Sequence, residues 1–198
     1  LFKYPETVIK AIKRTPPDII CLSNYSWNSN LSEYLASFTK KFNPNVVTVQ
    51  GGTNFPHKQD LQLKFLSERP ATDIYTVFEG EISCSNIVQR VIDSKKNRNK
   101  IFDKPIDGCV FIHPNSNNSS KKDFLVGRPL ERIKDLDEVP SPYLTAILDK
   151  FFDGKLTPFL ETNRGCPFTC TFCHTGSDYY HKLNKFSGQR VKEEINYI

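Results

Sequence analysis

Short apolar segments alternate with amphipathic segments through the first half of this 198-residue chain. Residues 18–23, 46–49 and 74–78 read as strands, and each is followed by apolar side chains at helical spacing. Strands that alternate with helices form a parallel sheet, because each helix carries the chain back to the start of the next strand. The pattern therefore predicts an α/β fold.

The strand at 18–23 is a nearly continuous apolar run, which predicts burial on both faces of the sheet. Helices are expected at 5–14, at 31–42, around 61–66 and around 87–92. Three loops, at 23–28, 51–52 and 79–81, directly follow the three strands. Since the carboxyl ends of parallel strands share one edge, these loops should line a common ligand crevice.

The chain becomes polar after residue 95 and stays so to residue 123, with an Asn/Ser-rich run at its centre. Only 108–112 interrupts it, as an expected edge strand or hairpin arm. Residues 128–150 read as a linker that ends in a short helix, and 157–163 as a new strand. We therefore predict a first domain at 1–112, a linker at 113–155 and the start of a second domain at 156–198.

Composition narrows the possible functions of the chain. The net charge is +5, but the basic residues are dispersed, so no nucleic-acid partner is expected. No apolar stretch reaches membrane-spanning length, and the expected location is the cytoplasm. The chain begins at Leu1 and contains no Met, which favours a piece of a longer protein that extends at both ends.

Six cysteines are present, and three of them stand close together. Cys166, Cys170 and Cys173 have the spacing Cys-x3-Cys-x2-Cys, which indicates a metal site in a reducing compartment. A ferredoxin ligates all four irons of a 4Fe-4S cluster with cysteine, whereas three cysteines leave one iron open. A zinc knuckle that also uses His174, or a non-catalytic iron–sulfur module with a fourth cysteine elsewhere, remains an alternative.

The run from Arg164 to Cys173 resembles the cysteine motif of the radical S-adenosylmethionine (SAM) superfamily. The resemblance implies a 4Fe-4S cluster whose open iron is chelated by SAM, and reductive cleavage of SAM to a 5′-deoxyadenosyl radical. It places Phe172 beside the SAM adenine. It also implies that 156–198 begins a partial TIM-type barrel, and that an electron donor such as flavodoxin or ferredoxin serves the cluster.

The first domain resembles the Rossmann-like cobalamin-binding domain that precedes the barrel in one class of radical SAM enzymes. Ser23-Asn24-Tyr25 stands in place of Ser-x-Leu, Gly51-Gly52 matches Gly-Gly, and Glu79-Gly80-Glu81 resembles Gly-Glu-Gly-Glu with Phe78 at the first glycine. The family's Asp-x-His-x-x-Gly segment, which can supply the cobalt ligand, would fall before Leu1. The resemblance implies cobalamin at Ser23, Gly51 and Gly52, and favours methyl transfer to a small-molecule or peptide substrate.

Two alternatives concern this first domain. It could be a vestigial scaffold that has lost cobalamin, with the radical chemistry retained. Tyr25 and Trp27 could pack on a corrin ring or serve as ordinary packing residues. Next to the cysteines, Glu161 and Arg164 are expected to form an ion pair at the strand edge, with orientation of the cluster loop or contact with SAM as the alternative. A helix is expected from Gln189.

Overall fold

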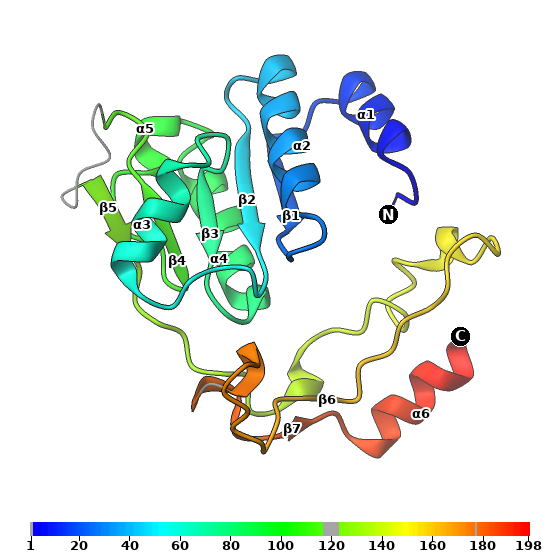
Figure 1. Ribbon diagram of the computed structural model, residues 1–198. Coiled ribbons are helices and arrows are strands. Elements are labelled where there is room, and N and C mark those ends of the chain that lie inside the picture. The colour runs from blue at the N-terminus through cyan, green and yellow to red at the C-terminus, as the bar shows by residue number, and fades with distance from the viewer. Residues whose placement is uncertain (1, 117–122, 177) are drawn as a thin grey trace. The chain divides into compact units, whose positions relative to one another are not determined.

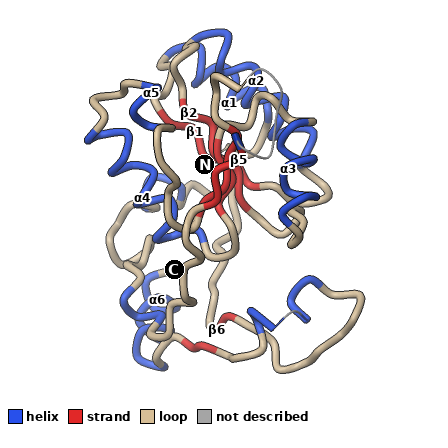
Figure 2. The backbone as a smooth tube through the Cα atoms, turned by 90° about the vertical axis from the view of Figure 1, so that its left-hand side faces the viewer, coloured by secondary structure: helices blue, strands red, loops and turns tan. Residues whose placement is uncertain are grey.

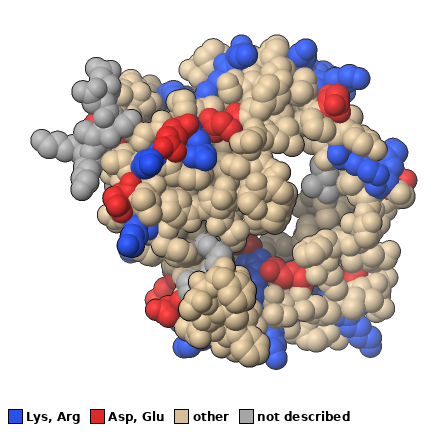
Figure 3. Space-filling view, viewed as in Figure 1, with Lys and Arg blue, Asp and Glu red and all other residues tan. Residues whose placement is uncertain are grey.

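The computed structural model describes residues 2–116, 123–176 and 178–198. The chain divides into two compact units, Phe2–Leu130 and Glu131–Ile198, which are described separately (Figure 1). No helix in the described ranges is long and apolar enough to cross a bilayer. On the face shown in Figure 3, basic and acidic side chains are interspersed.

The first unit is built on a five-stranded sheet with the order β1-β2-β3-β4-β5. Its strands are β1 (Ile19–Ser23), β2 (Val47–Gly51), β3 (Ile74–Thr76), β4 (Cys109–Ile112) and β5 (Phe124–Val126). The first three are parallel, and β4 and β5 are antiparallel. Ser23 pairs with Gly51, and Gly51 with Thr76, so β1, β2 and β3 end level with one another. The predicted α/β fold is confirmed, and the three loops do leave the sheet at one edge.

Helices cover both faces of the sheet (Figure 2). They are α1 (Pro5–Arg14), α2 (Ser29–Phe42), α3 (Gln59–Ser67), α4 (Gly80–Asp93) and α5 (Arg98–Ile101). On the α4 side, Ile87 and Val91 pack with the strand residues Val49 and Ile74 in one buried cluster. On the α3 side, Leu66 joins Phe55 and Tyr75, whose rings stack with centroids 3.8 Å apart. Each strand face thus has its own apolar core, as a two-sided sheet requires.

The structure differs from the sequence expectation at two strands. The prediction that 18–23 is buried on both faces is wrong, because Cys21 and Ser23 are exposed and Ile20 is half-buried. Among the described strands, β1 pairs only with β2, so it lies at an edge of the sheet. Conversely, β4 is a hairpin arm as expected, but it lies inside the sheet, and β5 forms the edge. The sheet therefore extends past residue 112, while the Asn/Ser-rich residues 117–122 fall outside the described part of the chain.

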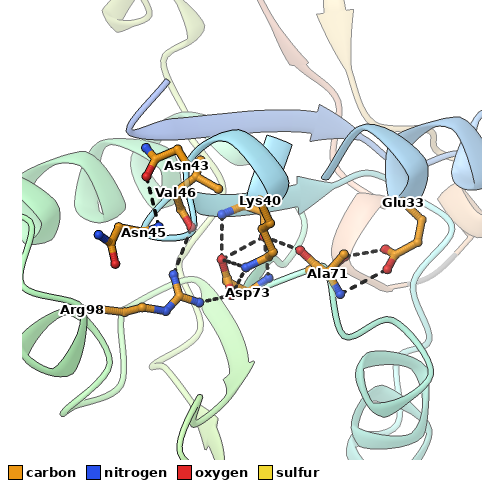
Figure 4. Close-up of polar contacts among 10 residues, drawn as sticks. Glu33, Lys40, Asn43, Asn45, Val46, Ala71, Asp73 and Arg98 are labelled. Carbon is orange, nitrogen blue, oxygen red and sulfur yellow. Dashed lines mark hydrogen bonds and ion pairs between the residues drawn. The ribbon is translucent and has the colours of Figure 1, made fainter. Parts of the chain in front are cut away.

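At the amino-terminal edge of the sheet, the Asp73 carboxylate binds side-chain and backbone groups from several elements (Figure 4). The Asp73 side chain is only 7% exposed and precedes β3. It accepts hydrogen bonds from the Lys40 ammonium at 2.7 Å, from the Thr48 backbone N–H at 2.9 Å and from the Arg98 guanidinium. Arg98 also donates to the Val46 carbonyl at 2.9 Å. Burial lowers the pKa of Lys40, while its contact with Asp73 opposes that shift.

The second unit has little regular structure before its last helix. It contains η2 (Leu136–Glu138), η3 (Asp149–Phe151), η4 (His174–Gly176) and η5 (Asp178–Tyr180), the strands β6 (Asn163–Arg164) and β7 (Asn184–Lys185), and α6 (Gly188–Tyr197). The strand expected at 157–163 is confined to its last residue and Arg164, and its partner β7 is antiparallel. Within 131–176 and 178–198 no closed barrel forms. The helix expected from Gln189 is confirmed as α6, and Ser187 caps it by accepting a hydrogen bond from the Arg190 N–H at 3.1 Å.

Phe78, after β3, has a left-handed backbone with φ of 65°. This conformation costs free energy in a residue that has a Cβ atom, whereas glycine adopts it without that cost. We therefore expect Phe78→Gly to unfold at a higher urea concentration than Phe78→Ala, by about 1 kcal/mol in the free energy of unfolding. At an ordinary position the order is the reverse. An alanine variant that is more stable than the glycine variant would contradict a left-handed backbone at this position.

Candidate functional site

The two glycines that end β2 are held against neighbouring loops. A Cβ on Gly51 would lie 2.2 Å from the Thr76 Oγ1, and one on Gly52 would lie 2.5 Å from the Asn24 carbonyl oxygen. Gly52 also has a φ of +133°, which side chains rarely adopt. Gly52 therefore requires glycine where β2 approaches the loop after β1, whereas a side chain at Gly51 would have to displace the Thr76 hydroxyl.

Asn24 connects these loops, and the sequence did not single it out as a site residue. It is fully buried, and its N–H donates to the Gly51 carbonyl at 2.6 Å. Its side-chain amide donates to Gln50, and its Oδ1 accepts from the Asn54 amide at 2.9 Å. The network continues through Gln50 to Glu33, 3.3 Å away. A polar residue directly after an apolar strand was the available signal for this role.

Ser23 and the following aromatic residues form the exposed part of this edge. The Ser23 hydroxyl accepts a hydrogen bond from the Asn28 amide at 2.7 Å. The rings of Tyr25 and Trp27 stack in parallel, with centroids 4.8 Å apart. Trp27 is 80% exposed, so it is not a core residue. This exposure argues against core packing for Trp27, while packing on a corrin ring or within a lid stays a prediction.

The three clustered cysteines lie on the loop between β6 and β7. Cys166 is half-buried, Cys170 and Cys173 are exposed, and all three thiols are free. The Cys166 N–H donates to the Tyr180 carbonyl at 2.8 Å, and the Cys173 N–H donates to the Cys170 carbonyl at 3.1 Å. Among the described residues, no three His, Cys, Asp or Glu side chains are close enough to share a metal ion. The structure therefore places the cysteines on one loop without gathering their sulfur atoms.

The residues of this loop nevertheless suit an iron–sulfur cluster. Its donors are soft thiols, and the Thr175 hydroxyl, 3.0 Å from Cys173, lowers the pKa of that thiol. Gly176 lets the loop close on itself, because a Cβ there would lie 2.3 Å from the Cys170 carbonyl oxygen. Phe172, which precedes the third cysteine, is 91% exposed and available to a ligand. The number and type of these donors would therefore fit an iron–sulfur cluster.

Arg132 supports both ends of the cysteine loop, and the sequence did not predict this. Its guanidinium donates to the Arg164 carbonyl at 3.1 Å and to the Lys182 carbonyl. The same group lies over the Tyr180 ring, 5.9 Å from the centroid.

The expected ion pair between Glu161 and Arg164 is confirmed, since the Arg164 Nε lies 2.9 Å from a carboxylate oxygen of Glu161.

Tyr143 is hydrogen-bonded to the backbone of the segment that precedes the cysteine loop. Its side chain is buried, its hydroxyl donates to the Phe159 carbonyl at 2.7 Å, and the same oxygen accepts from the Phe159 N–H at 3.0 Å. One phenol therefore satisfies both backbone groups of a residue that has no strand partner in the described chain.

Tyr143→Phe removes both hydrogen bonds and leaves the ring in place. Because each is worth about 1 kcal/mol, we expect the Phe159 amide to exchange with deuterium about tenfold faster or more. The control is Tyr197→Phe, since the Tyr197 hydroxyl binds the exposed Asp149 at 2.6 Å and should not alter that amide. Equal exchange rates in both variants would show that the Tyr143 hydroxyl does not hold this segment.

No protein-family model matches the sequence. Among characterised proteins, the chain is 30% identical over 191 residues to a 2-(S-pantetheinyl)-carbapenam-3-carboxylate methyltransferase of Streptantibioticus cattleyicolor, and this match covers 93% of the chain. It is also 30% identical, over 92% of its length, to the cobalamin-dependent radical SAM methyltransferase TokK of Streptomyces tokunonensis. The chain is homologous to cobalamin-dependent radical SAM methyltransferases.

The homology covers only part of each relative. The chain spans 26% and 25% of the lengths of these two methyltransferases. A Methylococcus capsulatus hopanoid C-3 methylase is 27% identical over 92% of the chain. A solved structure, the cobalamin-dependent S-adenosylmethionine radical enzyme OxsB, matches 98% of the chain with a TM-score of 0.64 at 18% identity, and the match covers 25% of that enzyme. This structural likeness supports the α/β fold of the homologous region.

Proposed function

We propose that this chain is the cobalamin-binding and cluster-binding region of a cobalamin-dependent radical SAM methyltransferase. The observation that carries the proposal is the three-cysteine loop, which follows an α/β unit with a glycine-lined carboxyl edge in a chain homologous to such enzymes. The cysteine loop alone would also fit a zinc module, and the α/β unit alone would also fit an unliganded Rossmann-like domain.

In this proposal, the thiolates of Cys166, Cys170 and Cys173 bind three irons of a 4Fe-4S cluster. When bound, the cluster supplies the electron that cleaves SAM into methionine and a 5′-deoxyadenosyl radical, which removes hydrogen from an unactivated carbon. The Thr175 hydroxyl favours the thiolate form of Cys173, which is the form that ligates iron. Phe172 offers its exposed ring to the SAM adenine.

The proposed cobalamin surface is the carboxyl edge of β1, β2 and β3. Ser23 presents an exposed hydroxyl there, and Gly51 and Gly52 keep the neighbouring backbone free of side chains. Asn24 acts as a positioning residue, because its hydrogen bonds fix the loop that follows Ser23 against the glycine loop. The aromatic surface of Trp27 lies on that same loop.

Metal analysis of the anaerobically purified full-length protein tests this proposal. We expect about four irons and one cobalt per chain, and 5′-deoxyadenosine from SAM and a reductant. Iron and 5′-deoxyadenosine without cobalt would show that the first unit is a vestigial cobalamin domain. Zinc in place of iron, without any 5′-deoxyadenosine, would overturn the whole proposal in favour of a zinc module.

A further inference from the structure

The three cysteines outside the cysteine loop of the second unit are Cys21, Cys84 and Cys109, and they lie on the α4 side of the first unit's sheet. Cys109 lies in the buried cluster on the α4 side, and Ile19 packs against that cluster. Since alternate residues of a strand point to the same face, Cys21 shares the face of Ile19. Its side chain therefore faces α4.

The helix α4 carries a second cysteine, Cys84. Val88, one helical turn after Cys84, lines a surface cavity of about 460 Å³ together with Ile19 and Ile92. Residues four apart lie on the same side of a helix, so Cys84 continues this row toward the end of β1 that carries Cys21. The two thiols therefore come close together there, and each shifts the pKa of the other.

The two members of this pair differ in acidity. The hydrogen bond from Cys21 lowers the pKa of Cys84 to about 7 and raises the pKa of Cys21 itself. Burial raises the pKa of the third thiol, Cys109, to about 12. Because the thiolate is the reactive form of cysteine, Cys84 is the nucleophile of the group. Cys21 is exposed, Cys84 is half-buried and Cys109 is buried.

We propose that Cys21 and Cys84 form a reversible oxidation site, at which hydrogen peroxide converts the two thiols into a disulfide between β1 and α4. The Cys84 sulfur attacks one peroxide oxygen, the O–O bond breaks, and a sulfenic acid and hydroxide form, the latter protonated to water. The Cys21 sulfur then displaces the hydroxyl group from the Cys84 sulfur, and the proton of Cys21 leaves with it as a second water. Two electrons pass from the thiols to the peroxide, and a dithiol reductant reverses the step.

This oxidation would tether the end of β1 to α4. Cys21 precedes Ser23 by two residues and Asn24 by three, so a disulfide would fix the strand from which the proposed cobalamin edge begins. The site itself does not depend on cobalamin or on an iron–sulfur cluster. Its test can therefore fail or succeed independently of the proposed function.

The test uses the full-length protein with Cys166, Cys170 and Cys173 replaced by alanine, so that no cluster reacts with the oxidant. The reduced protein is treated with hydrogen peroxide, its remaining thiols are alkylated, and tryptic peptides are identified by mass spectrometry. We expect a peptide that joins Cys21 to Cys84 and disappears after treatment with dithiothreitol. If the triple variant does not fold, the same mapping is done on the wild-type chain after removal of iron with a chelator.

Single substitutions assign the roles within the pair. In Cys21→Ser, Cys84 should stop at the sulfenic acid, which a 1,3-dione probe captures. In Cys109→Ser, the cross-link should form as in the parent protein. The proposal is overturned if both Cys21 and Cys84 remain alkylatable after the peroxide treatment, or if the cross-link joins either of them to Cys109 instead.

Discussion

Full-length protein carrying Cys170→Ala is expected to lose its iron–sulfur cluster and to form no detectable 5′-deoxyadenosine from SAM. Cys170 is exposed at the middle of the three-cysteine spacing, and two remaining thiolates cannot hold three irons of a cubane cluster. The measurement is iron and sulfide content after anaerobic reconstitution, followed by chromatography of the SAM cleavage products.

The matched control for this variant is Thr171→Ala. Thr171 is exposed on the same loop, directly after Cys170, and carries no metal-binding atom of its own in this proposal. It should retain both the cluster and SAM cleavage. If Cys170→Ala kept a full complement of iron and cleaved SAM at the parent rate, the assignment of this cysteine as a ligand would be wrong.

The largest stability effect is expected for Asp73→Ala. The substitution leaves the Lys40 ammonium, the Arg98 guanidinium and the Thr48 N–H without their shared acceptor. Removing one partner of a buried ion pair costs about 3–5 kcal/mol. Because the Lys40 and Arg98 side chains are 23% and 24% exposed, water can partly solvate them, so we expect a loss near the lower limit, about 3 kcal/mol. Urea unfolding followed by circular dichroism measures the loss.

Asp18→Ala provides the comparison. Asp18 pairs with Lys96 at 2.8 Å, but both side chains are more than half exposed. Such surface pairs contribute about 0–1 kcal/mol, so this variant should unfold close to the parent. Equal losses in the two aspartate variants would contradict a special role for the Asp73 network at the amino edge of the sheet.

The sequence predicted the α/β alternation well, because strand and helix periodicities are local properties. It could not predict that β1 lies at an edge of the described sheet, since that depends on which strands pair with it. The strand expected at 157–163 is present only as the two-residue strand β6, again because strand formation depends on a pairing partner. Only Asn163 and Arg164 find a partner, in β7, about twenty residues further along the chain. Apolar composition alone does not reveal whether a partner strand exists.

The candidate site, like the fold, could be predicted from the sequence only in part. The cysteines and the glycine pair were visible in the sequence, because their chemistry and spacing are local. Arg132 was not, since it reaches carbonyl groups 32 and 50 residues away, and only the fold brings them together. Phenylalanine itself gives no signal of the left-handed backbone at Phe78, and the only hint was that Phe78 stands where the resembling motif has glycine. Contacts of this kind are set by tertiary structure, and they position the residues that carry the chemistry.

The most direct test of the central claim is the electron paramagnetic resonance spectrum of the reduced, full-length protein with and without SAM. In the proposed site, three cysteine ligands would leave one iron of the cluster free to bind SAM. The account predicts a 4Fe-4S signal that changes when SAM is added. A cluster signal that SAM leaves unchanged, or the absence of any cluster in protein that has all three cysteines, would contradict it.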